Sequence, residues 1–159
     1  MSDLRYRLFA VVFALSLFLS FAPTAHAAGA RSIDVNLTTQ TITAYEGNTP
    51  VYSAGVTSGR PGWSTPTGTF SIVNRVYNET MDSSTIGIPR NSPGGYYLTG
   101  IYFTQYFDYN GDALHYNYWS PASAFGSYPT SHGCVGMQWG PAQYFWNFAT
   151  IGTPVTIHY

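Results

Sequence analysis

The sequence predicts a mainly β domain, and three observations support this prediction. Near the amino end, the apolar residues Ile33, Val35 and Leu37 alternate with polar ones, and a period of two is typical of a strand with one buried face. Aromatic residues make up 18% of the chain and charged residues only 8%, a composition that favours strands and turns over long charged helices. Only one segment, close to the carboxyl end, has the pattern of a helix.

The expected elements follow one another with turns rich in glycine and proline between them. We predict strands, in chain order, at residues 32–37, 40–45, 51–57, 69–77, 96–107, 113–118 and 154–158. The helix is predicted at 142–149, with Pro141 in its first turn and Gly152 beyond its end, since these residues favour those positions. Two long loops at 79–95 and 119–130 are rich in Ser, Pro and Gly, and such loops often carry function.

The first 27 residues have the pattern of a secretory signal peptide. Two arginines precede an almost wholly apolar run from Leu8 to Ala22, and Ala25-His26-Ala27 follows, which is the order of parts in such a peptide. The run is shorter than the roughly 20 residues of a membrane-spanning helix, although an uncleaved anchor is the alternative. We therefore predict a signal peptide over 1–27 and one exported domain over 28–159, without stable membrane insertion after cleavage.

The predicted mature domain carries little charge. Residues 28–159 contain four arginines, no lysine and six acidic residues, a formal charge of −2. An electrostatic nucleic-acid binder needs a basic face, so the composition excludes nucleic acid as a partner of that kind. About 130 residues suffice for a single hydrophobic core, and we expect a monomer.

The only cysteine of the chain, Cys134, stands at the end of the tetrapeptide Ser131-His132-Gly133-Cys134. A lone thiol in an exported protein has no internal disulfide partner. It is therefore an inert buried residue, half of an intermolecular bridge or a reactive nucleophile.

Two histidines are candidates to activate this thiol, because a thiol becomes a nucleophile when a neighbour lowers its pKa or takes its proton. His132 shares a face with Cys134 if the segment is extended. His115 lies on a predicted strand that can run alongside the cysteine segment. Gly133 permits a tight backbone, and the N–H groups of Gly133 and Cys134 are candidate donors to an oxyanion. Spacing alone leaves both an inert and a reactive thiol open.

A wider pattern resembles a known family. His115, fifteen intervening residues and Ser131-His132-Gly133-Cys134 are similar to the signature of the L,D-transpeptidase (YkuD-type) catalytic domain. Segments 65–70, 81–96 and 151–155 resemble further parts of that domain, so the likeness spans about residues 32–159. The resemblance implies a sandwich-like, mainly β fold with one short helix near the C-terminus. It also implies peptidoglycan stem peptides as substrates and no cofactor.

The resemblance implies roles for the residues of the signature. Cys134 is the expected nucleophile, which attacks the carbonyl before a terminal D-Ala and forms a thioester, and His115 is the expected general base. The backbone carbonyl of Tyr116 is expected to orient the imidazole. His132 is expected to line the site, and Ser131 to support the loop by hydrogen bonding.

One position departs from the family pattern. Two residues after the cysteine the family commonly has Asn or Arg, whereas this chain has Gly136. The usual side chain could shape the site or bind a polar group of the substrate, but its absence removes no atom that acyl transfer needs. Gly136, Ser131 and Tyr116 are the expected substrate-binding positions, and Gly133 joins Cys134 and the two histidines as an expected catalytic position.

Two other interpretations of the same residues stay open. A thiol hydrolase would release wall peptides instead of joining them, and a non-catalytic β domain would bind the wall through aromatic surfaces. Zinc binding by His115, His132 and Cys134 lacks further Cys or His at metal spacing, so we predict no metal site.

Asp108 and Asp112 flank the turn at Asn110-Gly111, where hairpin chemistry explains them without catalysis.

Overall fold

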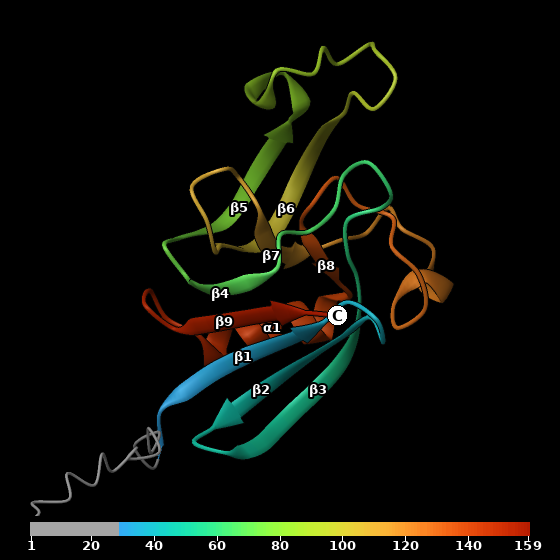
Figure 1. The fold of residues 1–159 in the computed structure, drawn as a ribbon. Helices are drawn as coiled ribbons and strands as arrows, with labels where there is room; N and C mark the ends of the chain where they lie inside the picture. Colours follow the sequence, from blue (N-terminus) through green and yellow to red (C-terminus); the bar gives the residue numbers. More distant parts are fainter. Residues whose placement is uncertain (1–28) are drawn as a thin grey trace, which may run out of the picture.

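Nine strands form one continuous sheet in the computed structural model, which describes residues 29–159 (Figure 1). The strands are β1 (Arg31–Asn36), β2 (Thr41–Glu46), β3 (Thr49–Thr57), β4 (Gly68–Ser71), β5 (Asn74–Asp82), β6 (Tyr97–Tyr106), β7 (Ala113–Tyr116), β8 (Val135–Met137) and β9 (Pro154–His158). Their order across the sheet is β4-β9-β1-β2-β3-β8-β7-β6-β5. The predicted signal peptide lies outside the described residues. Within them, no helix is long and apolar enough to cross a membrane.

The first strands follow the predicted alternation. β1 pairs with β2 in antiparallel register, so that Ile33 lies opposite Ala44 and Val35 opposite Ile42. All four side chains are buried, because residues opposite one another project to the same face of a sheet. The predicted mainly β fold is confirmed.

The segment predicted as one strand at 69–77 is divided between the two ends of the sheet, so this prediction is wrong. β4 pairs with β9, whereas β5 pairs with β6. The change of partner takes two residues, since the Ile72 N–H donates to the Thr153 carbonyl at 3.0 Å and the Val73 N–H to the Tyr106 carbonyl at 2.8 Å. Period-two alternation carries no information about which strand lies alongside.

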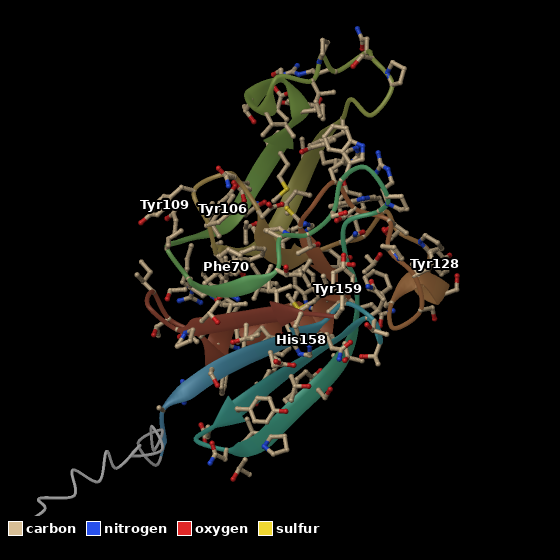
Figure 2. All side chains as sticks on the ribbon, viewed as in Figure 1. Phe70, Tyr106, Tyr109, Tyr128, His158 and Tyr159 are labelled. Carbon is tan, nitrogen blue, oxygen red and sulfur yellow. The ribbon has the colours of Figure 1, made fainter. Side chains whose placement is uncertain are left out.

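This crossing brings the two ends of the sheet together, so that the sheet curls. The rings of Phe70, on β4, and Phe107, just after β6, lie 5.4 Å apart. Figure 2 labels Phe70 on β4 and Tyr106, the last residue of β6. β5 also continues to Asp82 and is followed by a 3₁₀ turn at Ser83–Ile86. Part of the segment predicted as a loop at 79–95 is therefore strand and turn.

One α-helix, α1 (Trp139–Phe148), packs into the core. It begins three residues earlier than predicted, and Pro141 lies in its first turn. Its buried residues are Ala142, Phe145 and Phe148. A single buried apolar cluster joins these to side chains from both halves of the sheet, among them Ile33, Ile42, Phe103, Leu114 and Val135.

Two short strands, β7 and β8, lie side by side in the interior of the sheet. The parallel pairing of β7 with β8 aligns Leu114 with Val135 and His115 with Gly136. β8 was not predicted as a strand. It places Cys134 directly before the sheet, beside the strand that carries His115.

Candidate active site

Cys134 and His115 line one pocket of about 240 Å³. Its walls come from β5, β6, β7 and the loops before β4 and β8. The lining residues are Arg60, Met81, Tyr96, Leu98, His115, Trp119, Thr130, Ser131, His132 and Cys134.

The register of β7 and β8 explains why the thiol and the imidazole line the same pocket. His115 lies opposite Gly136, and Cys134 precedes Gly136 by two residues. Since side chains two residues apart share a face of a strand, Cys134 projects to the side of the sheet that His115 occupies. Gly136 contributes no side chain between them.

His115 is held in one orientation and one tautomer. Its Nδ1–H donates to the Tyr116 carbonyl at 2.8 Å, and because a carbonyl oxygen only accepts, the proton sits on Nδ1 and leaves Nε2 as the basic atom. The Trp119 ring stacks on the imidazole at 5.6 Å. His115 is only 1% exposed, and burial lowers its pKa to about 4. The imidazole is therefore neutral at pH 7.

Cys134 is a half-buried protonated thiol at neutral pH. Its Sγ–H donates to the Gly111 carbonyl across 3.7 Å. Burial, and next the negative charge of Asp112, raise the pKa of the thiol to about 12. At neutral pH the pocket is thus lined by a neutral thiol and a neutral imidazole.

This protonation state predicts slow alkylation of Cys134 at neutral pH. Since only the thiolate reacts, we expect the rate with iodoacetamide to rise about tenfold per pH unit between pH 7 and 10. Intact mass at timed intervals measures the rate, with a cysteine peptide as the reference that levels off near its pKa. A plateau for Cys134 below pH 8 would indicate a resting thiolate–imidazolium pair instead.

The loop from Ser131 to Cys134 is held by hydrogen bonds from two directions. The Ser131 hydroxyl donates to the Cys134 carbonyl at 2.5 Å and accepts from the Gly133 N–H at 3.1 Å. Thr65 Oγ1 donates to the Gly133 carbonyl at 2.6 Å. The Gly133 N–H, a candidate oxyanion donor from the sequence, is therefore engaged with Ser131 in this structure.

Gly133 stands at a position that only glycine fits. Its φ is +128°, a region that side chains rarely adopt, and a Cβ there would lie 2.2 Å from Asp112 Oδ1. Asp108 explains the hairpin turn, since its carboxylate accepts from the N–H groups of Asn110, Gly111 and Asp112. The Asp112 side chain lies against the cysteine loop instead.

We expect Gly133→Ala to destabilise the domain by about 1–3 kcal/mol, since strained φ and overpacking each cost energy of that order. Urea unfolding measures the change. Gly152→Ala is the matched control, because Gly152 also has positive φ, at +89°, but no heavy atom within 4 Å of the added Cβ. Equal losses in the two variants would show that the contact with Asp112 has no effect.

His132 lines the pocket but hydrogen-bonds to Arg60. The expectation of a shared face with Cys134 required an extended segment, and the chain bends between them at Gly133. Arg60 Nη2–H donates to His132 Nε2 at 2.6 Å, and the rings of Trp63 and Tyr96 pack on the imidazole at 5.0 and 5.1 Å. Burial, followed by the Arg60 charge, lowers the pKa of His132.

Neither Tyr116 nor Gly136 lines the pocket. The Tyr116 ring packs edge-on against Trp139 at 5.1 Å, and only its carbonyl contacts His115. A Cβ on Gly136 would lie 2.6 Å from Asn117 Nδ2. Asn117 is buried, donates to the Ser120 hydroxyl at 3.0 Å and accepts from the Ser120 N–H at 2.9 Å. Asn117 therefore fills the space beside Gly136.

Sequence reasoning missed several residues that build the site. Arg60, Tyr96 and Trp119 line it, and Thr65 supports it from the Thr65-Pro66-Thr67-Gly68 turn. In the sequence, that turn was the only indication of a role for Thr65. Arg60 and Trp119 lie in loops, and their positions gave no indication that they belong to the site. Among residues 29–159, no group of three or more His, Cys, Asp or Glu side chains is arranged to hold a metal ion.

The chain is similar in sequence to known L,D-transpeptidases. The family model of the L,D-transpeptidase catalytic domain (YkuD) matches residues 30–157. Probable L,D-transpeptidase 3 of Mycobacterium tuberculosis is 33% identical over 99 residues, which are 62% of this chain and 36% of that protein. L,D-transpeptidase 1 of the same species is 35% identical over 99 residues, 62% and 39% respectively. The match thus spans less than half the length of these curated relatives.

Solved structures agree with the sequence matches. The L,D-transpeptidase LdtMt1 in complex with imipenem superposes with a TM-score of 0.78 at 28% identity, covering 81% of this chain and 59% of that one. An L,D-transpeptidase from Mycobacterium smegmatis gives 0.77 at 26% identity, covering 82% and 59%. Since the family model covers nearly all of the described residues, this chain belongs to the L,D-transpeptidase catalytic domain family.

Proposed function

We propose that this chain is a cysteine-dependent acyltransferase that acts on peptidoglycan stem peptides. The observation that carries the proposal is the pairing of Cys134 with a buried His115 in one pocket, with Nδ1 of the imidazole fixed by the Tyr116 carbonyl. A neutral imidazole with a free Nε2 is the form that accepts a proton from a thiol. Membership of the L,D-transpeptidase family supports the substrate class.

In the first half-reaction, Cys134 Sγ attacks the carbonyl carbon that precedes the terminal D-Ala of a donor stem. Its proton passes to His115 Nε2. The tetrahedral intermediate then breaks its C–N bond, His115 returns the proton to the leaving nitrogen, and free D-Ala departs. The stem is left as a thioester on Cys134.

In the second half-reaction, the amine of a neighbouring stem attacks the thioester carbonyl. The amine loses one proton to His115, the C–S bond breaks, and the proton passes to the departing sulfur. The products are an amide cross-link and the free thiol. Water in place of the amine would give a shortened stem, which is the carboxypeptidase reaction.

Export fits this substrate, because peptidoglycan lies outside the cytoplasm. We propose that residues 1–27 direct the chain across the membrane, so that the domain works in the cell wall or periplasm. The formal charge of −2 over residues 28–159 argues against binding to nucleic acid, whose backbone is also negative.

Incubation with purified disaccharide-tetrapeptide tests the proposal. We expect cross-linked dimers and free D-Ala, read by mass spectrometry. Tripeptide without dimers would favour the hydrolase, and an unchanged substrate would contradict both enzymes. A second assay uses imipenem, the ligand of the similar LdtMt1 structure. We expect an intact-mass adduct on the wild type that is absent from Cys134→Ala.

A further inference from the structure

We propose that Arg60 is a specificity-determining residue that binds the terminal carboxylate of the acyl donor. The inference rests on the proposed function and extends it from the reacting bond to the group that leaves. It assigns a carboxylate subsite to the side of the pocket formed by Arg60, Thr130 and His132.

Arg60 provides the charge of the pocket. Among the residues that line it, Arg60 is the only arginine or lysine, and none is an aspartate or glutamate. His115 and His132 both have pKa values lowered by burial, so neither adds a positive charge at pH 7. The lining residues therefore present one cation and no anion to a ligand, and Asp112, whose charge acts on Cys134, is not among them.

No carboxylate within residues 29–159 neutralises this cation. Arg31 pairs with Glu46 and Arg90 with Asp82. Arg60 instead donates to neutral acceptors, the Thr130 carbonyl at 3.2 Å and His132 Nε2 at 2.6 Å. A half-buried guanidinium among neutral acceptors gains more from a carboxylate, since hydrogen bonds between two charged groups are about twice as strong.

The proposed donor brings a carboxylate to this place. In a stem that ends in D-Ala, the carboxylate carbon follows the scissile carbonyl carbon by about 4 Å. With that carbonyl at Cys134, the carboxylate must lie in the same pocket, where Arg60 is the matching charge. Met81 and Leu98 supply apolar surface suited to a small methyl side chain.

The test compares two donors that differ only in this group. Disaccharide-tetrapeptide and its C-terminal D-alaninamide form are each incubated with enzyme, and initial rates of tripeptide release and dimer formation are measured by mass spectrometry. We expect wild type to prefer the acid, and Arg60→Gln to reduce the acid-to-amide ratio by about 10- to 100-fold, the loss of one charge-assisted hydrogen-bond pair. Comparing ratios between enzymes cancels the intrinsic difference between the leaving groups.

Two further variants complete the design. Arg60→Lys keeps the charge without the planar fork, so it should retain part of the preference. Arg31→Gln removes one positive charge on β1, outside the pocket, and should leave the ratio unchanged.

The outcomes separate two kinds of failure. If Arg60→Gln slows both donors equally, the residue only supports His132 and the loop, and the inference is overturned while the proposed function stands. If wild type converts neither donor, the proposed function fails and the inference fails with it.

Discussion

Replacing Cys134 by alanine is expected to reduce acyl transfer by about 10⁴-fold or more, because the reaction loses the atom that holds the acyl group. The assay is formation of cross-linked dimers from disaccharide-tetrapeptide, with product masses followed over time. The lost side chain is small and half-buried, so the fold should be retained, and thermal unfolding checks this.

The same variant separates an enzyme from a binding domain. Cys134→Ala should still sediment with purified peptidoglycan if the pocket recognises the stem, while its cross-linking disappears. Cross-linking at the wild-type rate would refute the assignment of Cys134 as nucleophile and would leave the aromatic surfaces as the functional feature.

The second large loss of activity is expected when His115, the proposed general base, is replaced. His115→Gln should lower the rate of acylation by about 10²–10⁴-fold, the usual contribution of general acid–base catalysis. The pKa of the thiol, raised to about 12, leaves almost no thiolate at neutral pH once the proton acceptor is lost. The residual rate of the variant should therefore increase with pH as thiolate forms.

The wild type should show a different dependence on pH, with its change at low pH. Burial lowers the pKa of His115 to about 4, so the imidazole is already unprotonated above that pH. We expect a rate that falls only as the pH drops towards 4 and is flat through neutrality. His158→Gln is the matched control, because this histidine lies on β9 beside Asp34, outside the pocket. Identical pH profiles for wild type and His115→Gln would rule out His115 as the base.

The strands could be predicted from sequence wherever one face is buried, as in β1 and β2. The division of 69–77 between β4 and β5 could not, since the alternation continues while the partner changes. β8 escaped prediction because its three residues, including Gly136, are too few to show a period.

The central residues of the candidate site could be predicted because the motifs that indicate them are close together in the sequence. Ser131 and Cys134 share a tetrapeptide, and His115 stands at a spacing that resembles the family. The role of Arg60 could not be predicted, and the role of Thr65 had only its turn as a signal, since the two residues contact the loop from 72 and 68 residues away in sequence. Only the fold reveals which distant loop supports a motif.

The Asn117 side chain occupies the space beside Gly136, and this limits which substitutions the family can accept at these two positions. The resemblance leads one to expect Asn or Arg at position 136, and here Asn117, directly after the end of the neighbouring strand β7, fills that volume. A lineage that places a side chain at position 136 must first lose the one at position 117, since a Cβ 2.6 Å from Nδ2 has no room. The two sites should therefore change as a pair across descendants, in that order.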